Sequence, residues 1–282
     1  MLFRSGMSSC MINPFFMLKK ADKRGCYAFN LIYSGNHAEI VEAHTATDST
    51  RILVGLNDYC FDWTLKSGEM FETPQAVMLY AADEDEVTTQ MHTFVMKHVV
   101  DPEFAYKDRP VLFNNWEGTY FDFNSDKIVA IAEKAKNVGA ELFVLDDGWF
   151  GNKYPRSSDK SGLGDWEPTA SKLPNGVGGL VRAADSAGVK FGIWIEPEMV
   201  NPKSELYEKH PDWVIHYPNR EPYYYRNQMA LDLCNPQVQD FVFGVVDKLL
   251  SENPDLAYFK WDCNSMLTNP YSFYLKENQS HL

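Results

Sequence analysis

Two hydrophobic patterns divide the sequence, and the change between them falls near residue 110. Between about Cys26 and Ala82, short runs rich in β-branched and aromatic residues are separated by Gly, Asn, Asp and Ser turns, which predicts strands without crossover helices. The predicted strands are residues 27–35, 38–44, 51–56, 60–65 and 76–81. Residues 1–9 show neither a helix cap nor a strand start, so we expect the chain to begin inside a domain.

An acidic cluster at residues 83–86, followed by helical apolar spacing, predicts a helix and then a linker to residue 109. Beyond Pro110, short apolar strands alternate with helices, which indicates a parallel sheet covered by helices. Four such units fit either an open doubly wound sheet or half of a barrel. The predicted strands are residues 111–116, 141–149, 189–199 and 256–264, and the helices are 125–140, 179–188 and 236–253.

Each of these four strands ends in polar or aromatic side chains. A single acid at a strand end is more often the cap of the next helix, and two adjacent acids can be a simple turn. Four such ends favour a functional site, because working residues in α/β barrels lie where strands end. The side chains are Trp116 and Glu117, then Asp146, Asp147 and Trp149, then Trp194, Glu196 and Glu198, then Lys260 and Asp262.

The last strand contains the most specific pattern. Side chains alternate along a strand, so Lys260 and Asp262 share one face, whereas Phe259, Trp261 and Cys263 share the other. A structural ion pair is the plain alternative, although a buried pair seldom gains much stability. A carboxylate beside an ammonium keeps a low pKa, as a nucleophile toward an oxocarbenium-like carbon requires. With tryptophan faces and hydroxyl-binding acids nearby, the set indicates a sugar site.

Composition removes several other classes. The net charge of −13 argues against nucleic acid or an anionic membrane as a partner. Five widely spaced cysteines without a CxxC pair predict neither disulfides nor zinc and favour a reducing, cytoplasmic location. We find no signal peptide, spanning segment or phosphate-loop motif. The histidines lie away from the strand ends, which leaves Mg or Mn open, but no metal or organic cofactor is implied.

Seven motifs carry a family resemblance: NNWEGTYFDF, LFVLDDGWFG, GDWEPTASKLPNG, FGIWIEPEMV, KHPDWVIH, RNQMALDLCNP and YFKWDCN. In this order the chain resembles glycoside hydrolase family 36, the microbial α-galactosidases, from about Asn13 to Leu282. The resemblance implies an α/β fold in two parts. Residues 1–97 would be the end of an antiparallel β-sandwich with a linker helix, and residues 98–282 the first half of a catalytic (β/α)8 TIM barrel.

The resemblance also implies a reaction, the retaining hydrolysis of terminal α-D-galactosyl residues in oligosaccharides of the raffinose and melibiose type. It proceeds through a covalent galactosyl-aspartate. For Arg226, the arginine of the RNQ motif, a salt bridge within a loop is the alternative to substrate binding. Matching motif positions imply Asp262 as nucleophile, Lys260 as a hydroxyl-binding neighbour, Asp146 and Asp147 as ligands of the 4- and 6-hydroxyls, Trp116 and Trp194 as walls, and Arg226 as substrate-binding.

Two departures qualify this resemblance. Cys263, Asn264 and Ser265 stand where many relatives show Met-Asn-Arg, which leaves the nucleophile but changes the loop after it. The family's acid/base aspartate lies on a later strand with no counterpart here, so we expect an incomplete chain that is inactive and marginally stable alone. A raffinose- or stachyose-type galactosyl transferase and a non-catalytic galactose-binding module are the alternatives. Some relatives form tetramers, so a homotetramer is a candidate state of a full-length parent.

Overall fold

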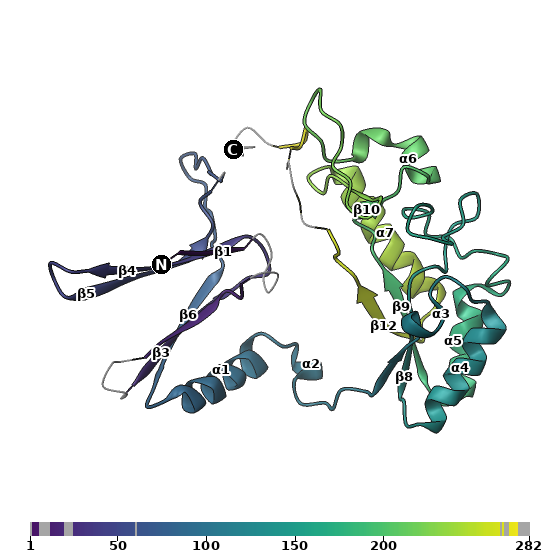
Figure 1. The fold of residues 1–282 in the computed structure, drawn as a ribbon, viewed down its shortest axis with the longest axis horizontal. Helices are drawn as coiled ribbons and strands as arrows, with labels where there is room; N and C mark the ends of the chain where they lie inside the picture. The colour runs from purple at the N-terminus through teal and green to yellow at the C-terminus, as the bar shows by residue number, and fades with distance from the viewer. Residues whose placement is uncertain are drawn as a thin grey trace. The chain divides into compact units, whose positions relative to one another are not determined.

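A computed structural model describes residues 2–5, 12–19, 25–59, 61–265, 267 and 271–275. The described residues divide into two compact units, those up to Asp108 together with Leu275, and Arg109–Tyr274. Figure 1 shows the first unit as a sheet region followed by α1 and α2, and the second as alternating strands and helices. The domain boundary at residue 97 stays a prediction.

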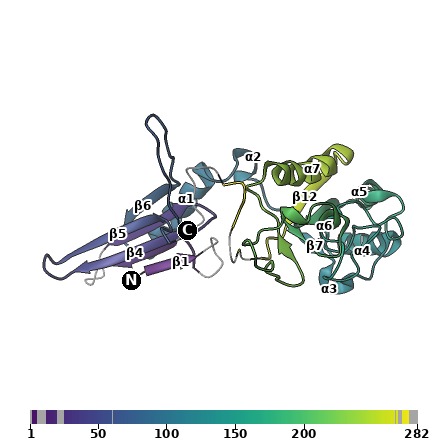
Figure 2. The same cartoon turned by 90° about the horizontal axis from the view of Figure 1, so that it is seen from above.

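The first unit contains two antiparallel sheets, each with three strands among the described residues. In one, the order is β1–β4–β5, with β1 at Leu2–Ser5, β4 at His37–His44 and β5 at Ser49–Leu56. In the other, the order is β2–β3–β6, with β2 at Phe15–Lys19, β3 at Cys26–Ile32 and β6 at Gln75–Ala81. Figure 2 shows β4 and β5 running side by side as a long hairpin.

Two features of the first unit correct the sequence prediction. Leu2–Ser5 forms strand β1, paired with β4, although the opening residues carry no start signal. This edge strand is defined by its pairing partner, which local propensity does not reveal. The strand predicted at 60–65 is wrong for residues 61–65, where the ring centroids of Phe61 and Trp63 lie 6.3 Å and 5.1 Å from that of Phe71. Aromatic packing stabilises a loop there, and Cys60 lies outside the described residues.

Helix α1, Glu84–His98, begins where the acidic cluster predicts. The Asp83 carboxylate accepts the Glu86 N–H at 2.9 Å, and the Glu86 carboxylate accepts the Ala82 N–H at 3.0 Å. These contacts satisfy donors that have no partner within the helix. Val87 of α1 packs on β3 and β6 in a small core. The short helix α2 follows at Pro102–Ala105, with Asp101 as its cap.

The second unit is built on one parallel sheet with the order β12–β9–β8–β7. Neighbours in the chain are therefore neighbours in space, and the winding never reverses within these strands. A doubly wound sheet would reverse its winding and place helices on both faces. Figures 1 and 2 show α4, α5 and α7 on one face, as in part of a barrel. The strands are β7 Leu112–Asn114, β8 Leu142–Leu145, β9 Lys190–Ile195 and β12 Leu256–Trp261, and the helices are α4 Ser125–Asn137, α5 Gly176–Ser186 and α7 Pro236–Glu252.

The core of this unit lies between the sheet and the three helices. Phe143 and Phe191 pair in register on neighbouring strands of this core, with ring centroids 6.1 Å apart, and the exposed Phe113 stacks on Phe143 at 5.9 Å. Since alternate residues face opposite sides of a sheet, burying this face turns Asp146 and Lys260 to the other side. The short elements are α3 Trp116–Thr119, β10 Met199–Val200, α6 Glu205–Lys209, the 3₁₀ helix η1 Pro211–Trp213 and β11 Met229–Ala230.

Candidate active site

The carboxyl ends of β8, β9 and β12 lie beside one another at one edge of the sheet. Lys260 pairs in register with Trp194, and the residues just before Asp146 and Trp194 pair in the same way. Asp262 directly follows β12, and its N–H donates to the carbonyl of Ile195 at 3.0 Å. The structure therefore brings Asp146, Trp194 and Lys260 to one level across three strands, and Asp262 lies two residues beyond Lys260 at the same edge.

Asp262 is half-buried and held through one of its carboxylate oxygens. Oδ2 accepts hydrogen bonds from Trp194 Nε1 at 3.1 Å and from Asn264 Nδ2 at 2.8 Å. Both donors are neutral groups. Among the described residues, Oδ1 accepts no hydrogen bond, so this oxygen is the one available to an incoming electrophile.

Lys260 pairs with Asp146, and this corrects the expectation that its ammonium lies beside Asp262. Nζ lies 2.7 Å from Asp146 Oδ2, which also accepts Asn114 Nδ2 at 2.6 Å. Residues two apart on a strand are about 6.5 Å apart along it, whereas Asp146 lies at the level of Lys260. The Lys260 side chain is 37% exposed and that of Asp146 only 4%, so the ammonium keeps access to solvent and ligand.

Asp147, the second acid of the LDDGW motif, is held by a buried arginine. Arg156 donates from Nε at 2.9 Å and 3.1 Å and from Nη2 at 2.8 Å, in a fork that fixes the carboxylate. Arg156 Nη1 also donates to Asn201 Oδ1 at 2.9 Å. Burial raises the pKa of the Asp147 carboxyl, and the guanidinium opposes that shift. The two adjacent carboxylates therefore pair with different cations, Asp146 with Lys260 and Asp147 with Arg156.

Two further carboxylates follow β9. Glu196 is 1% exposed; its Oε2 accepts Gln228 Nε2 at 2.8 Å and its Oε1 accepts the Asn264 N–H at 3.1 Å. Burial raises the pKa of Glu196 to about 7. Glu198 accepts Trp261 Nε1 at 2.7 Å, and burial raises its pKa as well. This edge of the sheet therefore contains two carboxyl groups whose pKa values are raised by burial, a feature that clusters at functional sites.

Trp116 lies on the loop after β7, as the first residue of α3. Its N–H donates to Asn114 Oδ1 at 2.8 Å, and the same asparagine holds Asp146. The half-buried indole packs edge-on against Tyr120 and Phe121, with centroids 5.2 Å and 5.1 Å away. This places a fixed aromatic surface one strand away from Asp146.

Arg226 is exposed and lies at the tip of a tight hairpin. Tyr225 and Gln228 exchange two backbone hydrogen bonds of 2.9 Å, and Arg226 and Asn227 between them have φ of +50° and +62°. Left-handed backbone at two consecutive non-glycine residues is costly and concentrates at functional sites. The Asn227 carbonyl accepts Asn201 Nδ2 at 2.8 Å, which ties this turn to the Arg156 network.

The sequence reasoning missed the partners that hold these side chains. Asn114, Gln228 and Asn264 stand inside the quoted motifs NNW, RNQ and KWDCN, so the motifs contained a signal for them. Arg156 stands in an irregular loop, where no period or spacing marks it. The described residues contain no group of three or more His, Cys, Asp or Glu side chains arranged to hold a metal ion. Over the same part of the chain, no helix is long and apolar enough to cross a membrane.

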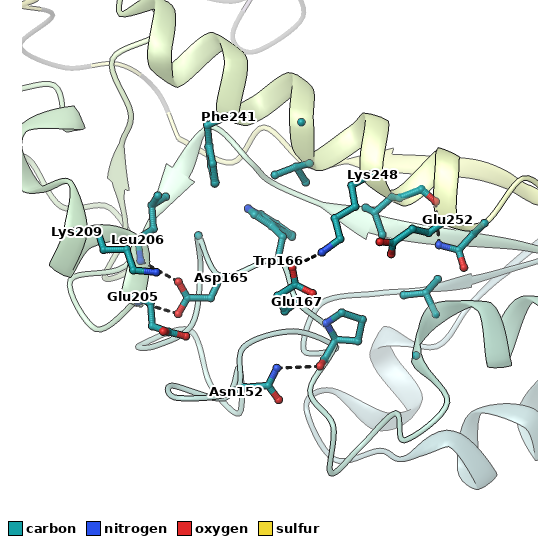
Figure 3. Close-up of a pocket in the computed structure, with 18 of the residues that line it drawn as sticks. Asn152, Asp165, Trp166, Glu167, Glu205, Leu206, Lys209, Phe241, Lys248 and Glu252 are labelled. Atoms are coloured by element: carbon teal, nitrogen blue, oxygen red, sulfur yellow. Dashed lines mark hydrogen bonds and ion pairs between the residues drawn. The ribbon is translucent and has the colours of Figure 1, made fainter.

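A separate cavity of about 700 Å³ lies among the loop before α5 and helices α5, α6 and α7. Figure 3 shows Trp166 and Phe241 facing this cavity, with Lys248 reaching toward Glu167. None of the seven predicted site residues lines it. The candidate active site is therefore the carboxylate-rich edge of the sheet.

A singly wound parallel sheet with acids at its carboxyl ends is the arrangement of an α/β-barrel enzyme. The Melibiase family profile matches residues 70–281, and the profile of the glycosyl hydrolase family 36 N-terminal domain matches residues 3–66. The chain therefore belongs to the Melibiase family, in its glycosyl hydrolase family 36 branch.

Relatives agree with this assignment. Alpha-galactosidase AgaA from Geobacillus stearothermophilus is 43% identical over 270 residues, which cover 94% of this chain and 36% of the relative. Alpha-galactosidase 1 from Pediococcus pentosaceus is 42% identical over 272 residues, 95% of this chain and 36% of its own length. The solved α-galactosidase from Lactobacillus brevis superposes with a TM-score of 0.92 at 40% identity, covering 98% of this chain and 38% of that structure. The chain thus spans little more than a third of these relatives and has the fold of that portion, a sheet domain followed by part of a TIM barrel.

Proposed function

We propose that residues 109–274 supply the galactose-binding and nucleophilic side of an α-galactosidase active site. The geometry of Asp262 carries this proposal. Its carboxylate stands at the end of a barrel-type strand, Trp194 and Asn264 fix one oxygen, and the other oxygen accepts no hydrogen bond from the part of the chain that the structure describes. A nucleophile needs this combination of fixed orientation and free lone pairs.

The proposed reaction retains configuration at the anomeric carbon. Oδ1 of Asp262 forms a bond to C1 of the galactosyl group while the bond from C1 to the leaving oxygen breaks, and that oxygen takes the electron pair. For an ordinary sugar leaving group, this oxygen also requires a proton from a second carboxyl group. Water then releases galactose from Asp262 in the second step. The proposal assigns the nucleophile to this chain and leaves the proton donor unassigned.

The hydrogen-bond donors and acceptors near Asp262 suit a sugar with several hydroxyl groups. Lys260 supplies N–H donors, and the carboxylates of Asp146 and Asp147 supply acceptors; Lys260 and Asp146 hold each other, and the buried Arg156 holds Asp147. Trp116 supplies an apolar surface, and Arg226 a cation at the rim. An AgaA variant from Geobacillus stearothermophilus was solved in complex with raffinose and another with stachyose, which supports galacto-oligosaccharides as the substrate class.

Selective binding of the galactose configuration tests this proposal. Calorimetry should show tighter binding of 1-deoxygalactonojirimycin than of its 4-epimer, 1-deoxynojirimycin, because the 4-hydroxyl would meet the Asp146 and Asp147 carboxylates. Asp146→Asn should weaken binding of 1-deoxygalactonojirimycin about tenfold or more, since the complex loses a charge-assisted hydrogen bond. Asp122→Asn is the matched control, because this exposed acid lies in the same unit and forms an ion pair with the surface residue Lys127. Equal affinity for the two epimers would contradict the proposal.

Two further proposals concern the assembly of the protein and its location in the cell. We infer a homotetramer for a full-length protein that contains this chain, and sedimentation of that protein would test it. We also infer a cytoplasmic location, which the free cysteines Cys26, Cys234 and Cys263 support. A native disulfide found by mass spectrometry would contradict that location.

A further inference from the structure

Glu196 connects to the proposed nucleophile through a single residue. Its Oε1 accepts the backbone N–H of Asn264 at 3.1 Å, and the side chain of Asn264 donates to Asp262 Oδ2 at 2.8 Å. The same N–H lies 3.0 Å from the Asp262 carbonyl, so it is shared between the strand end and the glutamate. Glu196, the residue that directly follows β9, therefore joins the end of that strand to the loop after β12.

We propose that Glu196 is a positioning residue, which anchors the Asn264 backbone so that the Asn264 side chain holds Oδ2 of Asp262 and turns Oδ1 to the anomeric carbon. This inference rests on the proposed function. It assigns Glu196 no contact with substrate. Its effect on Asp262 passes through Asn264.

The burial of Glu196 supports a positioning role over a surface or capping role. Its carboxylate is 1% exposed, and Gln228 Nε2 fixes its other oxygen at 2.8 Å. Gln228 is 1% exposed, and its own Oε1 has no hydrogen-bond partner among the described residues. Burying a carboxylate beside an unsatisfied amide oxygen costs stability, so this arrangement is poor for folding alone.

The charged and titratable groups around Glu196 come from two elements. Glu198 lies on the same loop and faces Trp261, whereas Asp262 and Cys263 lie on the loop after β12. Burial opposes ionisation of Glu196, and the negative charge of Glu198 acts in the same direction. A neutral replacement that keeps an acceptor oxygen at this position should therefore be tolerated.

A double-mutant cycle on the single-turnover labelling rate tests the inference. The probe is a 2-deoxy-2,2-difluoro-α-galactoside with a trinitrophenolate leaving group, which departs with its electron pair and needs no proton. Asn264→Ala should slow covalent labelling of the 282-residue chain between about 10-fold and 100-fold, because a hydrogen bond to a charged group is lost. Glu196→Met, which keeps the volume and removes the acceptor, should slow it similarly. The affinity for 1-deoxygalactonojirimycin should change less than threefold in both variants.

Non-additivity distinguishes positioning through Asn264 from an independent effect. The double variant should label no more than about threefold slower than Asn264→Ala alone. Glu196→Gln should restore labelling to within about threefold of the unchanged chain, since its amide oxygen can accept the Asn264 N–H once the Gln228 amide reverses. Glu133→Ala, an exposed change on α4, is the control and should label normally.

Two results would overturn the role of Glu196 while leaving the proposed function intact. If the unchanged chain labels and Glu196→Met labels at the same rate, Glu196 does not position the nucleophile. If the losses from Glu196→Met and Asn264→Ala multiply in the double variant, Glu196 acts by another route. If the unchanged chain neither labels nor binds the galactose analogue, the proposed function itself is wrong, and the inference falls with it.

Discussion

The buried pair between Asp147 and Arg156 makes a strong prediction about stability. Arg156→Met should lower the free energy of unfolding by about 3–5 kcal/mol, because it leaves the Asp147 carboxylate buried without its counter-ion. Urea unfolding followed by tryptophan fluorescence measures this change, since all tryptophans except Trp63 lie in the second unit. Arg182→Met is the control on an exposed arginine and should cost less than about 0.5 kcal/mol. A loss below about 1 kcal/mol for Arg156→Met would contradict the pairing.

Glu196 should make the stability of the second unit depend on pH. Its pKa is raised from 4.5 to about 7, so the folded state binds more protons than the unfolded state between these values. The contribution of Glu196 to stability is therefore full below about pH 4.5 and falls as the pH rises toward 7, by up to about 3 kcal/mol. Glu196→Gln removes this titration. The difference in unfolding free energy between the variant and the unchanged chain should grow from pH 4.5 to 8, and parallel curves would show that Glu196 ionises normally.

At the scale of elements, we expect the left-handed backbone of the Arg226 hairpin to lower stability while it positions the arginine for ligand binding. Arg226→Gly relieves left-handed strain, so we expect unchanged or slightly higher unfolding free energy together with weaker binding of 1-deoxygalactonojirimycin. Asn219→Gly is the matched control, because Asn219 also has positive φ, +62°, in an exposed turn. Both variants are measured by urea unfolding and calorimetry. Unchanged affinity in Arg226→Gly would remove this arginine from the substrate site.

The strands and helices of the second unit could be predicted because their apolar runs are long and periodic. That pattern also placed Asp146, Trp194 and Lys260 at strand ends, which the register confirms. It could not show that Lys260 reaches across β9 to Asp146, because hydrogen-bond partners depend on strand order and register. Strand β1 was missed for the same reason, since an edge strand is defined by its neighbour.

At the scale of the molecule, the assigned residues predict a dependence on the leaving group. They supply a nucleophile and a sugar site, whereas an ordinary glycosidic bond also needs a proton donor. We therefore expect this chain to react with an activated aryl α-galactoside at least about 100-fold faster than with raffinose, because a general acid contributes about 10²–10⁴-fold. Release of the phenolate and of galactose measures the two rates. Comparable turnover of raffinose would show that the chain contains its own acid.

The central claim is that Asp262 is a nucleophile positioned by the carboxyl ends of three parallel strands. The most direct measurement is intact-mass analysis of the 282-residue chain after incubation with the activated difluoro-galactoside, followed by peptide mapping. We predict one galactosyl adduct, on Asp262, that is lost in Asp262→Asn. The Geobacillus stearothermophilus relative serves as the positive control. An adduct on another residue, or binding of the galactose analogue without any adduct while the control labels, would contradict the claim and favour a galactose-binding module.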